Sequence, residues 1–136
     1  MREIEFRGKR VDNNNWVYGY YLVNEIRNEH KIHYKSENPL VRGMSTVEVD
    51  PSTVSQYTGF KDKNNKKIYE NDIVYHRTSL TFEWGKIKGD IYYHVRWNDG
   101  HYDIRCKKTY ETLLLENWYL DIEIISNAID DPDLVE

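Results

Sequence analysis

Short runs of alternating apolar and polar residues, separated by turn-forming residues, constrain this chain more than any other feature. The clearest case is Asn98-Asp99-Gly100, which lies between the alternating segment 91–97 and the segment 101–106. An Asp-Gly pair between two such segments is a strong signal for a tight β-hairpin. Since segments of this kind recur with a turn about every ten residues, the sequence predicts an all-β protein with little helix.

A second hairpin is expected near the N-terminal end. Residues 2–11 alternate in polarity, and residues 12–15 are a turn by composition. The aromatic and β-branched segment 16–23 is the expected partner strand, with a bulge considered at Gly19. Further strands are expected at residues 31–34, 44–49, 53–58, 72–76 and 121–126. Residues 113–117 are compatible with either a strand or one helical turn, and a short helical turn is expected at 132–135.

The stretch 50–74 links the two halves of the chain. Residues 61–67 carry no large apolar side chain and are therefore predicted to be an exposed loop. Asn64-Asn65 lies at its tip, and asparagine tolerates the left-handed backbone of a tight turn. We expect one of these two asparagines to have a positive φ.

The same stretch resembles the signature of the YopX family, small proteins encoded by phages and prophages of Gram-positive bacteria. The resemblance rests on Asp50-Pro51-Ser52-Thr53-Val54, Gln56-Tyr57-Thr58-Gly59 and Ile68-Tyr69-Glu70-Asn71-Asp72-Ile73-Val74. Ser55, Asn65 and Asn71 stand where the family usually has glycine. Asparagine keeps access to positive φ, whereas Ser55 is expected in ordinary β conformation. Residues 4–7, 16–19, 122–127 and 131–134 resemble the opening and closing segments of the family, which has no established biochemical activity.

The second half has a weaker resemblance, to an SH3-like barrel. It rests on the order of Asp72-Ile73-Val74, Gly85-Lys86-Ile87 and residues 93–100. We therefore expect a single YopX-like domain over 1–136, with a hairpin-based subdomain at about 1–60 and a small SH3-like barrel at about 68–128. The core is expected to contain eight residues from the apolar faces of these strands: Phe6, Trp16, Tyr57, Ile68, Ile73, Val95, Trp97 and Ile124.

Charge is distributed unevenly along the chain. The net charge is −4, but residues 1–108 carry all 19 basic and 15 acidic side chains, whereas the segment from Thr109 onward carries 8 acidic and no basic ones. This asymmetry favours either attraction between copies, and hence a homo-oligomer, or simply a solvated acidic terminus. Cys106 is the only cysteine, and no apolar run approaches the ~20 residues of a membrane helix. We expect a cytoplasmic protein of a bacterial host cell that has no disulfide and does not enter a membrane.

Catalytic, cofactor and metal sites are not expected. His94, Asp99, His101 and Asp103 lie near one turn, but strand alternation sends neighbouring side chains to opposite faces, so their spacing fixes no ligand set. Glu70 and Asp72 are interpreted as turn and capping groups. We expect that the protein is not an enzyme, although a site hidden from the sequence stays a third alternative.

Basic and aromatic residues gather in the second half, and the candidates for partner binding are Trp84, Tyr92, Arg96, Tyr102 and Arg105. Cations for phosphates and rings for base stacking are a composition typical of nucleic-acid binding. An ordinary mixed surface explains the same residues, and the pI of 5.7 argues against tight DNA binding. The sequence thus favours a phage or prophage accessory protein that contacts an unknown host or phage protein. The alternative is a nucleic-acid-binding module built on the SH3-like barrel.

Overall fold

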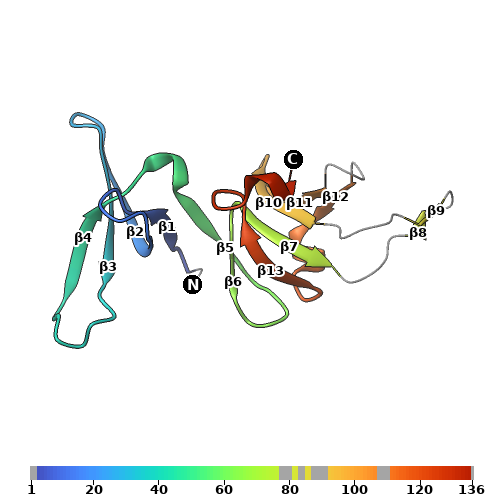
Figure 1. The fold of residues 1–136 in the computed structure, drawn as a ribbon, viewed down its shortest axis with the longest axis horizontal. Coiled ribbons are helices and arrows are strands. Elements are labelled where there is room, and N and C mark those ends of the chain that lie inside the picture. Colours follow the sequence, from blue (N-terminus) through green and yellow to red (C-terminus); the bar gives the residue numbers. More distant parts are fainter. Residues whose placement is uncertain (1–2, 77–80, 83–84, 87–91, 107–110, 136) are drawn as a thin grey trace. The chain divides into compact units, whose positions relative to one another are not determined.

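The computed structural model describes residues 3–76, 81–82, 85–86, 92–106 and 111–135 (Figure 1). The chain divides into two compact units, Met1–Tyr57 and Thr58–Glu136. Most of the described residues lie in antiparallel strands, which confirms the all-β class. Helix is limited in these residues to α1 (Leu115–Trp118) and two short 3-10 turns, η1 (Pro51–Thr53) and η2 (Pro132–Val135). None of these helices is long and apolar enough to cross a membrane.

The first unit is one antiparallel sheet. Its strands are β1 (Phe6–Lys9), β2 (Trp16–Asn24), β3 (Glu29–Lys35), β4 (Met44–Glu48) and the beginning of β5 (Ser55–Lys61), in the order β4-β3-β2-β1-β5. The predicted N-terminal hairpin is confirmed, because Lys9 pairs with Trp16 across the 12–15 turn. Ser55 has the ordinary strand conformation that was expected.

Three buried residues, Val17, Ile32 and Val49, form the core of the first unit. Tyr57 is buried as predicted, with 5% of its surface exposed. Phe6 and Trp16, which we also expected in the core, are only half-buried. Trp16 lies on the face of β2 opposite the core residue Val17, and Phe6 lies at the end of the β1–β2 pairing, where its ring contacts that of the half-buried Tyr21.

Gly19 lies at a close approach of two backbones and not at a bulge. The pairing of β1 with β2 runs without a shift up to Gly19, and the pairing of β2 with β3 begins at the next residue, Tyr20. A Cβ atom at Gly19 would lie 2.2 Å from the backbone oxygen of His33. Only glycine allows β2 to change partners at this point without displacing β3.

Residues 51–53 form the 3-10 turn η1, so the extended conformation expected for Thr53 was wrong. Asp50 caps this turn by accepting a 3.0 Å hydrogen bond from the backbone N–H of Ser52. The Thr53 hydroxyl donates to the Asp50 carbonyl oxygen at 2.7 Å and accepts from the Lys9 N–H at 2.8 Å. These local bonds outweigh the β preference of threonine.

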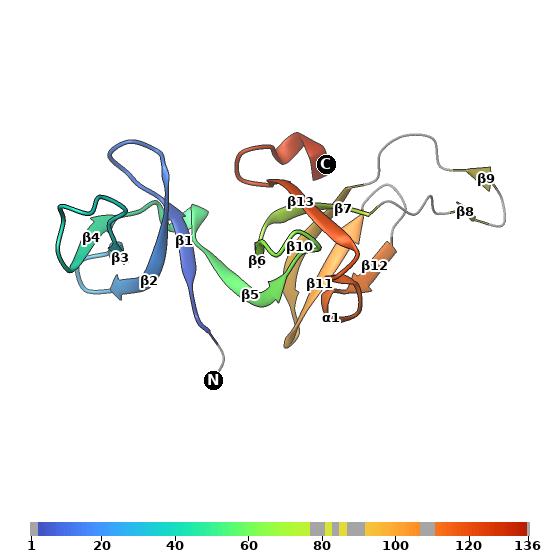
Figure 2. The ribbon, with the colours of Figure 1, turned by 90° about the horizontal axis from the view of Figure 1, so that it is seen from below.

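The second unit is built around a five-stranded antiparallel sheet (Figure 2). Its strands are β7 (Asp72–His76), β10 (Tyr92–Asn98), β11 (His101–Cys106), β12 (Glu111–Leu114) and β13 (Ile122–Asn127), in the order β12-β11-β10-β7-β13. The end of β5 pairs with β6 (Lys67–Tyr69), and β8 (Thr81–Phe82) pairs with β9 (Gly85–Lys86). β12 and β13 are the two edges of the five-stranded sheet in the described residues, so the closed barrel stays a prediction.

The core of the second unit lies on one face of this sheet and includes Ile68, Val74, Tyr93, Val95, Ile104, Leu115 and Ile122. Ile68, Ile73 and Val95 are fully buried, as predicted, and Ile124 is half-buried. Trp97 was predicted wrongly, because 51% of its surface is exposed. It shares the apolar alternation of β10 but lies one residue before the hairpin turn, beyond the packed part of the sheet.

The turns follow the predicted chemistry. Asn65 and Asn71 have φ values of 64° and 68°, so both asparagines that replace a family glycine adopt the left-handed conformation. Asp99 and Gly100 also have positive φ and connect β10 to β11 as a two-residue hairpin loop. The segment 113–117, expected to be either a strand or one helical turn, contains both, since β12 ends at Leu114 and α1 begins at Leu115.

The predicted exposure of the 61–67 loop is confirmed for most of its residues; Asp62 is buried at 3% exposure, and Lys67, the first residue of β6, is half-buried. The Asp62 carboxylate accepts hydrogen bonds from the backbone N–H groups of Asn64, Lys66 and Ile124, at 2.9, 2.9 and 3.0 Å. The loop therefore surrounds a buried carboxylate that ties it to β13.

Candidate functional site

β2 carries apolar side chains on both of its faces. Val17 and Tyr21 point to the core of the first unit, whereas Tyr18, Tyr20 and Leu22 alternate with them and are 47%, 61% and 50% exposed. A sheet face that exposes a row of large apolar side chains is uncommon on a protein that contacts nothing. We define the outer face by this row and its cross-strand neighbours: Lys9, Trp16, Tyr18, Tyr20, Leu22, Lys31 and His33.

Cations flank the rings of the outer face. The guanidinium of Arg7 lies 4.8 Å from the centroid of the Trp16 ring, and the ammonium of Lys9 lies 5.4 Å from it. Such cation–π contacts hold the indole in place. On the other side of β2, His33 lies opposite Tyr20 and forms a 2.8 Å hydrogen bond with the Thr46 hydroxyl.

The strand β4 forms one edge of the first unit's sheet. Its sequence, Met-Ser-Thr-Val-Glu, contains neither proline nor lysine, the residues that commonly protect an edge from pairing with another chain. Met44 at its start is 43% exposed. The edge thus adds backbone hydrogen-bonding groups to the apolar row of the outer face.

A cavity opens where β2 and β3 stop pairing. The two strands are paired between Tyr20–Asn24 and Glu29–His33, and the residues beyond this pairing border a cavity of ≈ 320 Å³. We call it the strand-end cavity. Its lining combines aromatic rings, amides and charged groups: Arg10, Asn13, Asn15, Trp16, Val17, Tyr18, Tyr34, Lys35 and Glu37.

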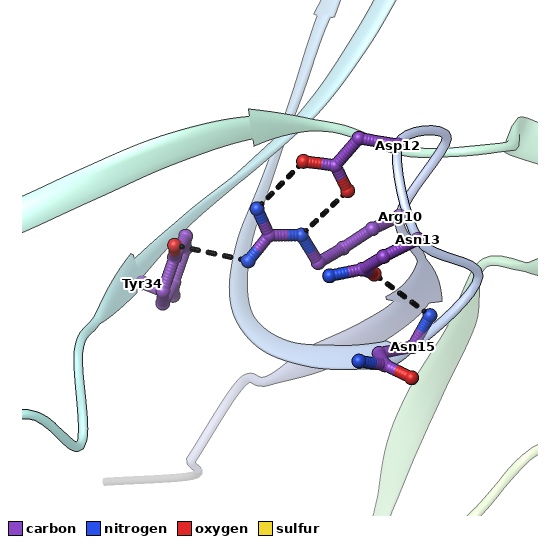
Figure 3. A network of polar contacts seen from close by, with 5 residues as sticks. All are labelled: Arg10, Asp12, Asn13, Asn15 and Tyr34. Carbon is purple, nitrogen blue, oxygen red and sulfur yellow. Dashed lines mark hydrogen bonds and ion pairs between the residues drawn. The ribbon is translucent and has the colours of Figure 1, made fainter.

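Arg10 is held in a defined orientation beside this cavity (Figure 3). Its Nε and Nη2 donate to the two carboxylate oxygens of Asp12 at 2.9 and 2.8 Å, and Nη1 donates to the Tyr34 hydroxyl at 3.4 Å. The hydrogen bond to Asp12 raises the pKa of Arg10, and the same bond lowers the pKa of Asp12. Asn13 accepts from the backbone N–H of Asn15 at 3.0 Å, which fixes the turn that carries both amides.

The candidates from the second half do not form one surface. Tyr92, Arg96 and Arg105 lie on the same face of the β10–β11 pair, as their register shows. Tyr102 lies on the opposite face and is only 7% exposed. Its ring packs edge-on against that of Trp97, with 4.8 Å between the ring centroids. Tyr102 is therefore a core residue and not a contact residue. Trp84 lies outside the described residues.

Arg96 already has an acidic partner. Its Nε lies 3.7 Å from the carboxylate of Asp103, which is fully buried and accepts a 3.2 Å hydrogen bond from the Asn98 amide. The Nε2 atom of His94 lies 3.0 Å from the amide oxygen of Asn71, which belongs to the turn before β7. In the part of the chain that the structure describes, no group of three His, Cys, Asp or Glu side chains could hold a metal ion.

Sequence reasoning missed both the outer face and the strand-end cavity. The signal was present in residues 16–23, which are apolar at nearly every position. A period of two identifies a half-buried strand only when one face is polar, so this run could not show which face is solvent-exposed. The cavity depends on where the pairing of β2 and β3 ends, which the residues alone do not fix.

Comparisons with known proteins show the family and the fold. The family model described as YopX protein matches residues 5–136. The chain is also similar to the crystal structure of protein EF1440 from Enterococcus faecalis, with a TM-score of 0.60, 18% identity and coverage of 100% of both chains. At this identity the likeness shows the fold alone. No curated protein matches the chain.

Proposed function

This chain belongs to the YopX protein family, and from that premise we propose that it is a non-enzymatic interaction protein, an accessory protein of a phage or prophage in the cytoplasm of its bacterial host. The phage setting follows from the family resemblance. The proposal of a contact protein is supported chiefly by one observation, the row of exposed Tyr18, Tyr20 and Leu22 on the outer face.

The partner that best suits the outer face is another protein. Tyrosine, tryptophan, methionine and arginine are enriched at protein interfaces, and the outer face offers the first two beside the exposed Met44 at its edge. The edge of β4 supports the same reading, because an extended segment of a partner can add to it as a further strand before Glu48, whose carbonyl already accepts from the Val11 N–H at 3.1 Å. The partner is an unidentified host or phage protein, or a second copy of this chain.

The alternative function, nucleic-acid binding by an SH3-like barrel in the second unit, has weaker support. Arg96 is matched by Asp103, and Tyr102 is buried, which leaves Tyr92 and Arg105 of the described candidates. Two residues provide few of the phosphate and stacking contacts that such binding needs. A gel shift at several salt concentrations tests this alternative directly.

Affinity capture from host cells tests the proposed contact surface. The bait is the full chain, compared with a Tyr20→Ser/Leu22→Ser variant and with Leu120→Ser, a matched control at a residue of the second unit that is 67% exposed. We expect a protein retained by the wild type and by the control to be lost from the double variant. Equal retention by all three, with the double variant still folded, would remove the outer face as the contact surface.

A further inference from the structure

We propose that the strand-end cavity of the first unit binds a nucleobase, presented either by a free nucleotide or by an unpaired residue of a single strand. This inference goes beyond the proposed protein contact, because it concerns a ligand of the cavity, which shares only Trp16 and Tyr18 with the outer face. It rests on the size of the cavity, its rings, its oriented polar groups and its charge.

The size and the rings suit one planar group. A volume of ≈ 320 Å³ lies near the lower end of the range for small-molecule sites, about 300–1,000 Å³. Trp16, Tyr18 and Tyr34 all line it, and the Trp16 ring is held by cation–π contacts with Arg7 and Lys9. Aromatic side chains stack on bases whatever the base, because every base has a π-face.

The polar groups suit the edge of a base. The amide of Asn15 combines a donor and an acceptor, which is the pattern that base edges present, and Asn13 adds the N–H donors of its amide, since its oxygen already accepts from the Asn15 backbone N–H. Arg10 is oriented before any ligand arrives, since Asp12 and the Tyr34 hydroxyl hold its guanidinium from different sides. These bonds occupy only part of its N–H donors, and guanidinium donors are well suited to the acceptor atoms of purines.

The charges favour the base over the phosphate as the group that is recognised. Arg10 is paired with Asp12, and the remaining charged residues of the lining, Lys35 and Glu37, have opposite signs. The lining is therefore close to neutral, and a phosphate alone gains little there.

An NMR titration of the full-length, ¹⁵N-labelled protein tests the inference. The probes are UMP, GMP and a short oligouridylate, with ribose 5-phosphate as the ligand that lacks a base. We expect the nucleotides, but not ribose 5-phosphate, to shift the side-chain amide signals of Asn13 and Asn15 and the indole N–H of Trp16. Tighter binding of the oligouridylate than of UMP supports a single strand as the source, whereas equal binding supports a free nucleotide.

Two variants place the site. Tyr18→Ala removes a ring that is 47% exposed, and we expect it to weaken nucleotide binding about tenfold. Tyr75→Ala removes a tyrosine of the second unit and should leave binding unchanged. No shift with any nucleotide, an equal response to ribose 5-phosphate, or an equal loss in Tyr75→Ala would each overturn the proposal. The affinity capture with Tyr20→Ser/Leu22→Ser is independent of these results, because neither residue lines the cavity.

Discussion

Short acidic and amide side chains determine where this chain turns. The carboxylates of Asp50, Asp62 and Asp72 each accept a hydrogen bond from a backbone N–H two or three residues away. Asn65 and Asn71 supply the positive φ that tight turns need. These residues need no distant contact to favour a turn, which is why their neighbourhoods were predictable. The burial of Asp62 was not, because its exposed lysine neighbours give the loop a fully solvated composition.

Asp62 should be the most sensitive residue of the 61–67 loop. Replacing it with alanine removes the acceptor of three backbone N–H groups, so we expect Asp62→Ala to lower the free energy of unfolding by about 3 kcal/mol. The neighbouring Lys63→Ala breaks only a 3.5 Å ion pair with Glu123 at the surface and should cost less than about 1 kcal/mol. Denaturant unfolding measures both, and equal losses would contradict the role of Asp62.

Trp97 should contribute less to the free energy of unfolding than a fully buried tryptophan would. Because half of its surface is exposed and its main ring partner is Tyr102, we expect Trp97→Ala to cost about 1 kcal/mol. Ile104→Ala, in the fully buried part of β11, should cost about 2–5 kcal/mol. Thermal unfolding of the two variants ranks them, and a larger loss for Trp97→Ala would show that the ring is buried in solution.

The ion pair at the tip of the first hairpin should respond to acid. The pKa of Asp12 lies below its ordinary value of 3.8 because of the hydrogen bond from Arg10. The pair therefore supports the fold above that ordinary value and is lost as the pH falls through the lower, folded pKa. A ¹³C NMR titration of the Asp12 carboxyl checks the direction. In an Arg10→Gln variant its midpoint should move up, and an unchanged midpoint would exclude Arg10 as the cause.

At the scale of elements, most strand positions were predictable, and so was the burial of Ile73 in β7 and Val95 in β10, but the buried face of β2 was not. β7, β11 and the β10–β11 hairpin follow from local alternation and from the Asp99-Gly100 turn. β2 has apolar residues on both faces, so only the tertiary structure shows that Trp16 and Tyr20 lie outside the core. The change of partners at Gly19 likewise depends on how far β3 extends, which no local signal reports.

Gly19 should tolerate no side chain. The added methyl of Gly19→Ala would lie 2.2 Å from the His33 oxygen, so β3 must move or lose its pairing. We expect a loss of about 1–3 kcal/mol, as for other overpacked sites. Amide hydrogen exchange across β3 should be faster in the variant than in the wild type, whereas exchange in the second unit should be unchanged. Unchanged protection across β3 would mean that the methyl group is accommodated without displacing β3, which would contradict the prediction.

At the scale of the whole molecule, the charge asymmetry of the sequence leads to a prediction about assembly. Every lysine and arginine precedes Thr109, and only acidic residues carry charge after it. Attraction between the basic part of one copy and the acidic part of another, together with the exposed outer face, leads us to expect a homo-oligomer.

Light scattering at low and high salt tests this expectation. Raised salt should weaken the assembly, because exposed charges are screened over about 10 Å at 0.1 M. A salt-insensitive oligomer would assign the assembly to the apolar row of β2 or to the β4 edge. A monomer mass at every salt concentration would end the hypothesis.

The strand β5 has a consequence for how the chain is made. Its first residues pair with β1, where Gln56 lies opposite Phe6, and its last residues already belong to the second unit. During synthesis on the ribosome, β1 can therefore pair with β5 only after almost the entire first unit has been made. The two units are also joined without a spacer, so a protease cut or an inserted tag in β5 would damage both. A better place for such an insertion is the turn at residues 25–28 between β2 and β3, where all four residues are exposed.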